Sequence, residues 1–383
     1  MDRRSFLSLS ASGLVGLGLT GPSELLNAGE ADGISRLAPG KGRRYSVVVI
    51  GDTHYDLAPE SIYHSLYDEP VEWLNRVQRE EFARNGEMWK ERCPSLVRRA
   101  AGLADASTRF ALQLGDLVQG DCGSGDVHRK MLSDAMDTVK AGLGGLPLVT
   151  VVGNHDIRGK DAEAVYNEYM PLRMSAELGV PVAKTTFSFT VGDDAWIVAD
   201  FNRPDDAEMD RLLARSEGAR NTFIVVHGPA FPIDGSAARW FYQGSLKQTE
   251  ARHHFRREFA RRNAIVLCGH SHCTELADWY GDGGRITQMT FNSVWASEPL
   301  GSYVVDSEGA DNYGSLRGRI RANADGTPLK DESALFDEYR PGLKRYVHSP
   351  AAGSYRLDVS PRGITVDFYA GASQARSARF MLR

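Results

Sequence analysis

The chain of 383 residues contains only four cysteines, Cys93, Cys122, Cys268 and Cys273. They form neither a C-x-x-C pair nor zinc-finger spacing, which argues against a redox dithiol and against a zinc-finger module. A chain of this length buries a large apolar core and does not depend on disulfides for its stability. Cys268 and Cys273 lie close enough in sequence to line a site or to form a bridge. We expect Cys268, which ends an apolar run, to pack as a core residue.

The sequence also lacks a strong charge and a long apolar run. Its formal net charge is -5, and its isoelectric point is about 6.1. Without a basic field or a basic stripe studded with aromatics, nucleic acid is not an expected partner. No apolar stretch approaches the roughly 20 residues that a membrane-spanning helix needs, so we predict no transmembrane helix. Anions must therefore be handled locally, through metal ions or arginines.

The N-terminus differs from the rest of the chain. Arg3 and Arg4 precede a modest apolar segment rich in glycine and serine, Phe6–Leu19. This order is typical of a signal peptide, and "RRSFL" resembles a twin-arginine export signal. We predict that residues 1–31 are an export signal and that the protein is periplasmic or extracellular.

Five apolar runs rich in valine and isoleucine each stop at a cluster of polar residues. Runs of this length and composition are typical of strands that are buried on both faces. With their polar ends, the runs are Tyr45–His54, Arg109–Asp116, Leu146–Asp156, Asn221–Pro229 and Ala264–His272.

Segments with helical spacing of apolar residues lie between these runs. They are 69–92, 94–102, 127–143, 161–170, 205–216 and 248–262. Alternating strands and helices predict an α/β fold with a largely parallel sheet. Three further segments, 184–201, 284–295 and 354–371, alternate apolar and polar residues and predict a second sheet with antiparallel pairing. Two of these contain turn signals, at 192–194 and 361–363.

The polar residues at the ends of the apolar runs have the chemistry of metal ligands. In open α/β sheets, ligands bind beyond the carboxyl ends of the strands. Carboxylate, amide and imidazole groups are what intermediate first-row metals prefer. The residues at these ends are Asp52, His54, Asp116, Asn154, His155, His227, His270 and His272.

These residues occur in five ordered blocks, "DTH", "GD", "GNHD", the histidine of "VVHGP", and "GHSH". In this order the chain resembles the calcineurin-like metallophosphoesterase superfamily, in its bacterial phosphodiesterase and phosphohydrolase branch. The resemblance implies a four-layer α/β/β/α sandwich of two mixed sheets flanked by helices, with a metal site at the strand carboxyl ends. It also implies one catalytic domain over residues 32–383, with a helical insertion at 57–108 and a loop-rich rim at 301–350.

The resemblance implies two metal ions, which the ligand types allow to be Fe, Mn, Zn or Co. Asp52, His54 and His272 would bind the first ion. Asn154, His227 and His270 would bind the second, and Asp116 would bridge the two. His155 would serve as general acid or as a stabiliser of transition-state charge. Three neighbouring residues are further candidates: Arg158 as a phosphate contact or an ordinary surface arginine, and Asp156 or Asp121 as the partner that orients an imidazole.

The implied reaction is hydrolysis of a small phosphoester by metal-activated hydroxide attacking phosphorus. Phosphomonoesters and phosphodiesters both fit, including nucleotides and glycerophosphodiesters. The chain lacks the tyrosine that purple acid phosphatases place after the bridging aspartate and the "GDYVDRG" block of the protein phosphatases, so the resemblance does not extend to them. The alternative is a scaffold of the same fold that binds partners without catalysis. Trp240 and Tyr242 are candidates for a wall of the substrate site.

Overall fold

The computed structural model describes residues 36–37, 43–56, 80, 89, 92–232, 246–293, 303–315 and 333–383. These residues all belong to one compact unit, Ile34–Arg383. The predicted export signal, most of the segment 57–91, and Trp240 and Tyr242 lie outside the described residues. Among the described helices, none combines the length and the apolar character that crossing a membrane requires.

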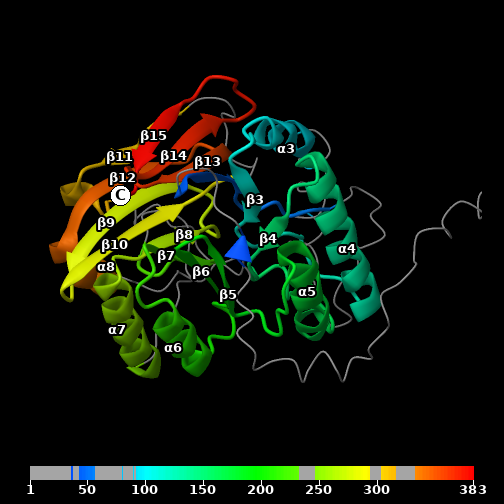
Figure 1. Cartoon of the computed structure of the whole chain (residues 1–383), viewed down its shortest axis with the longest axis horizontal. Helices are drawn as coiled ribbons and strands as arrows, with labels where there is room; N and C mark the ends of the chain where they lie inside the picture. Colours follow the sequence, from blue (N-terminus) through cyan, green and yellow to red (C-terminus); the bar gives the residue numbers. More distant parts are fainter. Residues whose placement is uncertain are drawn as a thin grey trace, which may run out of the picture. The chain divides into compact units, whose positions relative to one another are not determined.

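Two mixed β-sheets form the centre of this unit (Figure 1). The larger sheet has nine strands in the order β1-β5-β6-β7-β8-β10-β9-β12-β11. Its strands are parallel from β6 through β7 and β8 to β10, and antiparallel from β10 outward to β11. Their bounds are β1 Arg36–Leu37, β5 Phe187–Val191, β6 Asp194–Ala199, β7 Asn221–Val226, β8 Ile265–Cys268, β9 Thr274–Gly281, β10 Gly284–Thr290, β11 Ser307–Glu308 and β12 Leu343–Ser349.

The smaller sheet has six strands in the order β15-β14-β13-β2-β3-β4. The strands β2, β3 and β4 run parallel to one another, and β13 pairs antiparallel with β2. Thus the beginning and the end of the described chain lie side by side in one sheet. The bounds are β2 Tyr45–Ile50, β3 Thr108–Gln113, β4 Leu148–Thr150, β13 Gly353–Ser360, β14 Gly363–Ala370 and β15 Ala378–Met381.

Helices cover the outer face of each sheet. On the smaller sheet, α3 contacts β2 and β13, α5 contacts β4, and α4 packs against both α3 and α5. On the larger sheet, α6 contacts β6, and α7 contacts β9 and β10. Figure 1 shows the two helix groups beside their own sheets. The result is the predicted four-layer sandwich. The bounds are α3 Cys93–Ala101, α4 Gly125–Gly142, α5 Ala162–Leu178, α6 Asp206–Arg215, α7 Leu246–Arg261 and α8 Ser333–Tyr339.

Strand β7 explains why the apolar runs are continuous. Phe223 and Val225 belong to the core that joins the two sheets, which includes Leu112 of β3. The alternate residues Ile224 and Val226 belong to a second core, formed with α6 and α7. Because successive side chains of a strand point to opposite faces, a strand with a core on each side needs apolar residues at every position.

The sheet assignment differs from the sequence prediction in one respect. The five apolar runs form strands but do not share one parallel sheet, because β2, β3 and β4 lie in the smaller sheet and β7 and β8 in the larger one. The segments predicted to form a separate antiparallel sheet instead contribute strands to both sheets. Burial on both faces is the same for either sheet, so the apolar pattern does not distinguish them.

The end of one helix and the content of one segment also differ from the sequence prediction. Helix α5 continues through Pro171 to Leu178, where we predicted an end at Met170. The carbonyl oxygen of Pro171 accepts a hydrogen bond from the Ser175 hydroxyl at 2.8 Å. Within 301–350, predicted to be loop-rich, β12 supplies seven residues to the larger sheet between β9 and β11.

Candidate metal centre

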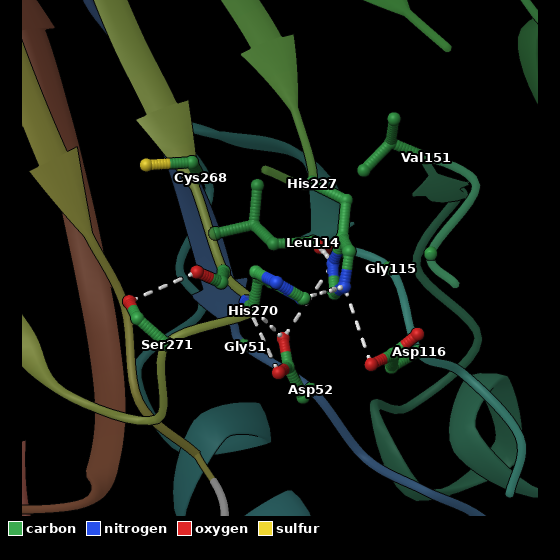
Figure 2. A network of polar contacts seen from close by, with 12 residues as sticks. Gly51, Asp52, Leu114, Gly115, Asp116, Val151, His227, Cys268, His270 and Ser271 are labelled. Atoms are coloured by element: carbon green, nitrogen blue, oxygen red, sulfur yellow. Dashed lines mark hydrogen bonds and ion pairs between the residues drawn. The ribbon is translucent and has the colours of Figure 1, made fainter. Parts of the chain in front are cut away.

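The predicted ligands lie on loops that follow strands of both sheets. Asp52 and His54 follow β2, Asp116 follows β3, and Asn154 follows β4 of the smaller sheet. The remaining predicted ligands, His227, His270 and His272, follow β7 and β8 of the larger sheet. Figure 2 shows Asp52, Asp116, His227 and His270 pointing toward one another from these loops. The site therefore lies where the carboxyl ends of both sheets meet.

Asp52, His54 and His272 form the first cluster, in which one donor atom of each residue lies within 4.8 Å of the others. Nε2 of His272 is 3.0 Å from Oδ2 of Asp52 and 3.3 Å from Nε2 of His54. Burial raises the pKa of the Asp52 carboxyl, but His227 and His272 outweigh it and leave that pKa below its usual value. A carboxylate and two imidazole nitrogens that converge in this way suit a first-row metal ion.

Asp116, His227 and His270 form the second cluster on the same criterion. Nε2 of His227 is 3.2 Å from Oδ2 of Asp116 and 3.2 Å from Nδ1 of His270. Nδ1 of His227 lies 2.7 Å from the carbonyl oxygen of Leu114. It therefore donates its hydrogen to that oxygen, which leaves Nε2 as the nitrogen that faces the site.

The pKa values of the two histidines in the second cluster are shifted in opposite directions. Burial lowers the pKa of His227, but Asp116 and Asp52 outweigh burial and raise it to about 9. Burial and the nearby His227 lower the pKa of His270 to about 3. The carboxylates of Asp116 and Asp52 therefore favour positive charge at His227. The cluster is thus built around a positive charge at this position.

Asp116 connects the clusters, because it also groups with His54 and His155. Its Oδ2 lies 3.2 Å from Nε2 of His227 and 3.7 Å from Nε2 of His54. Its Oδ1 accepts a hydrogen bond from the backbone N–H of His155 at 2.7 Å. Burial raises the pKa of Asp116, yet the imidazoles, led by His227, hold it well below its usual value. One carboxylate therefore faces histidines from both clusters.

Asn154 fits a ligand role on a separate observation. Its side-chain oxygen Oδ1 is buried and has no hydrogen-bond partner among the residues that the structure describes. A buried amide oxygen without a donor costs about 1–3 kcal/mol. A metal ion would satisfy this oxygen. The residues of both clusters and Asn154 therefore fit a metal centre.

The backbone of the site is held in an uncommon conformation. His54, Asp116, His270 and His272 all have positive φ angles, of 44°, 48°, 68° and 50°. Left-handed backbone at a residue other than glycine costs of order 1–3 kcal/mol and persists only where its surroundings enforce it. Such strain concentrates at functional sites, and here it coincides with the predicted ligands.

Gln119 contacts two of the histidines and was missed by the sequence analysis. Its side-chain oxygen lies 3.0 Å from Nδ1 of His54, and its backbone oxygen lies 2.9 Å from Nδ1 of His155. Each ring donates through Nδ1 and presents Nε2 to the site. A glutamine three residues after the "GD" block carries no local signal of this role.

His155 and Arg158 lie beside the two clusters. Nη1 of Arg158 is 3.4 Å from Nε2 of His155, so the guanidinium donates to the ring. Burial, followed by the charge of Arg158, holds the pKa of His155 well below its usual value. Nε2 of His155 therefore accepts the hydrogen bond from Arg158, and Nδ1 donates to the backbone oxygen of Gln119.

The other two candidate residues, Asp121 and Asp156, contact a guanidinium and backbone N–H groups. The Asp121 carboxylate forms a salt bridge with Nη2 of Arg158. The Asp156 carboxylate accepts hydrogen bonds from the backbone N–H groups of Gly153, at 2.8 Å, and Val118, at 3.1 Å. Burial, followed by Asp116, raises the pKa of Asp156 to about 7. Asp156 thus joins the loops after β3 and β4.

Two residues after β10 brace the site and were also missed. Asn292 donates from Nδ2 to the carbonyl oxygen of His272 at 2.8 Å. The Ser293 hydroxyl accepts from the N–H of Gly51 at 2.8 Å and donates to the carbonyl oxygen of Gly353 at 2.7 Å. The available signal was weaker than for the ligands, because "NS" lies in the segment 284–295, which alternates apolar and polar residues. The four cysteines are buried and free, so Cys268 and Cys273 form no bridge.

Solved structures are similar to this chain in fold. PhoD superposes with a TM-score of 0.51 and 14% sequence identity, over 90% of this chain and 69% of PhoD. For a purple acid phosphatase from yellow lupin (Lupinus luteus), the TM-score is 0.49 and the sequence identity 13%, over 90% of this chain and 54% of the lupin chain. For a dimetal phosphatase from Danio rerio, the TM-score is 0.45 and the sequence identity 12%, over 88% of this chain and 98% of the Danio rerio chain. No curated protein matches the chain in sequence.

The model of a protein family described as calcineurin-like phosphoesterase matches residues 45–274. This match spans β2 to the start of β9, which includes every loop that carries a predicted ligand. It covers more than half of the chain and agrees with the five sequence blocks and with the fold. The chain belongs to the calcineurin-like phosphoesterase family.

Proposed function

We propose that this protein is a dinuclear metal-dependent phosphoester hydrolase. The observation that carries the proposal is that Asp116 groups with His227 and His270 of the second cluster and also with His54 of the first. Asp52, His54 and His272 would hold one ion, and Asn154, His227 and His270 the other, with Asp116 shared. When bound, the pair would activate water as the nucleophile and offset the charge of the phosphoryl oxygens.

The residues next to the clusters would bind the ester and manage its charge. Arg158, held by Asp121, presents a guanidinium at the edge of the site and suits a phosphate oxygen. An anionic ester that draws Arg158 away from Nε2 of His155 would raise the pKa of that ring. His155 would then carry a proton at Nε2 and pass it to the leaving oxygen.

Hydrolysis of model esters tests the proposal. Purified protein loaded with Mn²⁺ should hydrolyse p-nitrophenyl phosphate, its bis-ester, or both. The variant Asp116→Asn should lose at least about 10²-fold in kcat, as expected for removal of one key charged group. Asparagine also tolerates the left-handed backbone at this position, so the substitution changes charge and not shape. Metal-loaded protein that hydrolyses neither ester would contradict the proposal.

A scaffold of the same fold without catalysis is the alternative. Binding scaffolds need no metal donors, whereas here the donors converge and His155 lies beside them. Elemental analysis separates the two functions. At least two metal ions per chain support the hydrolase, and less than one per chain supports the scaffold.

We also propose that the protein is exported through the twin-arginine route. The support is the sequence of Arg3, Arg4 and the apolar segment that follows. A bacterial fusion of residues 1–40 to a reporter should appear in the periplasm, and replacement of both arginines by lysine should retain the reporter in the cytoplasm. A reporter that stays cytoplasmic with the native residues would refute the proposal.

A further inference from the structure

A second group of metal-type donors lies outside the proposed catalytic centre. Cys273, Glu275 and His348 each offer one donor atom, and these atoms all lie within 4.8 Å of one another. The three residues are only 4%, 2% and 5% exposed. Carboxylate and imidazole groups are seldom fully buried together without a partner, because each favours water or a charged partner.

Strand pairing brings these residues together. In the larger sheet, Glu275 of β9 lies directly opposite His348 of β12. Cys273 precedes Glu275 by two residues and so points to the same face of the sheet. Ala277, two residues further on, packs in the core that includes α6 and α7. The group therefore lies on the helix-covered face of the larger sheet, away from the interface between the two sheets.

His348 is oriented as a metal-binding histidine. Its Nδ1 lies 2.9 Å from Oδ1 of Asp306, so the ring donates there. The lone pair is then on Nε2, which is buried and, within the described part of the chain, has no hydrogen-bond partner. A carboxylate behind a histidine fixes the ring and strengthens it as a ligand, and metal-binding histidines commonly have such a carboxylate or a backbone carbonyl behind them.

Hydrogen bonds alone account for only part of the group. The Cys273 thiol has weak contacts with Oγ of Ser271 at 3.4 Å and Oγ1 of Thr290 at 3.7 Å. The Tyr346 hydroxyl donates to Oε2 of Glu275 at 3.3 Å. These contacts leave Nε2 of His348 without a donor, at a cost of about 1–3 kcal/mol. A cation between the three side chains would remove this cost.

We propose that Cys273, Glu275 and His348 bind a Zn²⁺-type divalent cation, distinct from the proposed catalytic pair. Sulfur and imidazole donors with one carboxylate are typical of zinc and unlike the all-oxygen sites of Ca²⁺ and Mg²⁺. Binding would release the thiol proton to solvent. Because Cys273 follows His272 in the chain, the ion would tie β12 to the loop that carries two ligands of the proposed catalytic centre.

The chemistry of sulfur permits a test on the unaltered protein. No predicted ligand of the catalytic centre contains sulfur, so a metal–sulfur signal reports the new site alone. X-ray absorption of the fully Zn²⁺-loaded protein should require one sulfur neighbour at about 2.3 Å per three metal ions. With Co²⁺ in place of Zn²⁺, a thiolate-to-metal charge-transfer band should appear in the near ultraviolet. Absence of both signals from the loaded protein would overturn the proposal.

Variants assign the signal to its residues. Cys273→Ser should abolish the Co²⁺ band and lower the bound metal by one ion per chain, and His348→Gln should weaken binding at least 10-fold. Cys93→Ser, which alters a buried cysteine at the start of α3, should keep the band. Asp116→Asn should also keep it, which separates failure of this site from failure of the proposed hydrolase. Persistence of the band in Cys273→Ser would overturn the proposal. If that variant does not fold, the sulfur signal of the native protein still decides.

Discussion

The side-chain oxygen of Gln119 lies 3.0 Å from Nδ1 of His54, the ring nitrogen that points away from His272. Gln119→Leu removes this acceptor and lets the imidazole rotate. We expect metal affinity at the first cluster to fall about 10- to 100-fold, as for other partners of metal-binding histidines. Isothermal titration with Mn²⁺ measures the change. Gln119→Glu retains an acceptor oxygen and is the control. Equal affinity in Gln119→Leu and the native protein would refute this orienting role.

Gly153 has no room for a side chain. A Cβ at this position would meet the backbone nitrogen and the Oδ1 oxygen of Asp116 at less than van der Waals distance. Gly153→Ala should therefore displace Asp116 and lower kcat/KM for p-nitrophenyl phosphate about 10²-fold. Gly102→Ala is the control, since its nearest neighbours lie at 3.4 Å and its φ of -67° suits alanine. An unchanged kcat/KM in Gly153→Ala would contradict the placement of Asp116.

The salt bridge between Arg158 and Asp121 predicts coupled effects on substrate binding. Arg158→Ala should raise KM about 10-fold through loss of a phosphate contact. Asp121→Asn should raise KM less, because the guanidinium remains but is no longer held. The double variant should resemble Arg158→Ala alone, since Asp121 acts through Arg158. Additive effects in steady-state kinetics, or a change in kcat with constant KM, would contradict the proposed phosphate contact.

His155 should matter most for poor leaving groups. An alkyl phosphoester needs a proton on its departing oxygen, whereas p-nitrophenolate leaves without one. We expect His155→Ala to lower kcat about 10²- to 10⁴-fold on the alkyl ester and much less on the p-nitrophenyl ester. Comparison of the two rates in each protein tests this difference. An equal loss on both esters would identify charge stabilisation, and not proton transfer, as its role.

Buried His128 makes stability depend on pH. Burial lowers its pKa to about 4, and its Nε2 lies 2.8 Å from the carbonyl oxygen of Asp156. Between pH 6.5 and 4 the unfolded chain binds a proton at this residue that the folded protein does not bind. The free energy of unfolding therefore falls as the pH falls through this window, by up to about 3 kcal/mol.

The variant His128→Gln isolates this contribution. It cannot titrate, and its amide can still donate to Asp156. Denaturant unfolding at pH 7 and pH 4.5 should show a smaller loss of stability for the variant than for the native protein. The same loss in both proteins would show that other groups govern the acid response.

The sequence was sufficient to predict the ligand loops, because each loop is encoded locally. A valine-rich strand followed by glycine and a metal-type donor places its ligand at the carboxyl end of the strand in either sheet. Asn154 is an example, since its position after β4 was readable from "GNHD" and its buried, unpaired oxygen agrees with a ligand role. The assignment of strands to sheets was not readable, because both sheets bury both faces of their central strands.

The residues that sequence reasoning missed act through contacts between distant segments. Gln119 reaches His54 across two loops, and Ser293 joins Gly51 to Gly353. His348 lies in a segment without a clear pattern, and only the pairing of β12 with β9 brings it to Glu275. Such contacts depend on strand order and register, which local hydrophobic patterns do not encode.

The pairing of β13 with β2 has a consequence for the order of assembly. Strand β2 leads directly to Asp52 near the beginning of the described chain, yet one of its neighbours is synthesised about 300 residues later. During synthesis β2 therefore has one open edge until β13 emerges, and pairing across such a sequence separation is slow. We expect the first ligand loop to settle only in the last phase of refolding, after the β7–β8 side has formed.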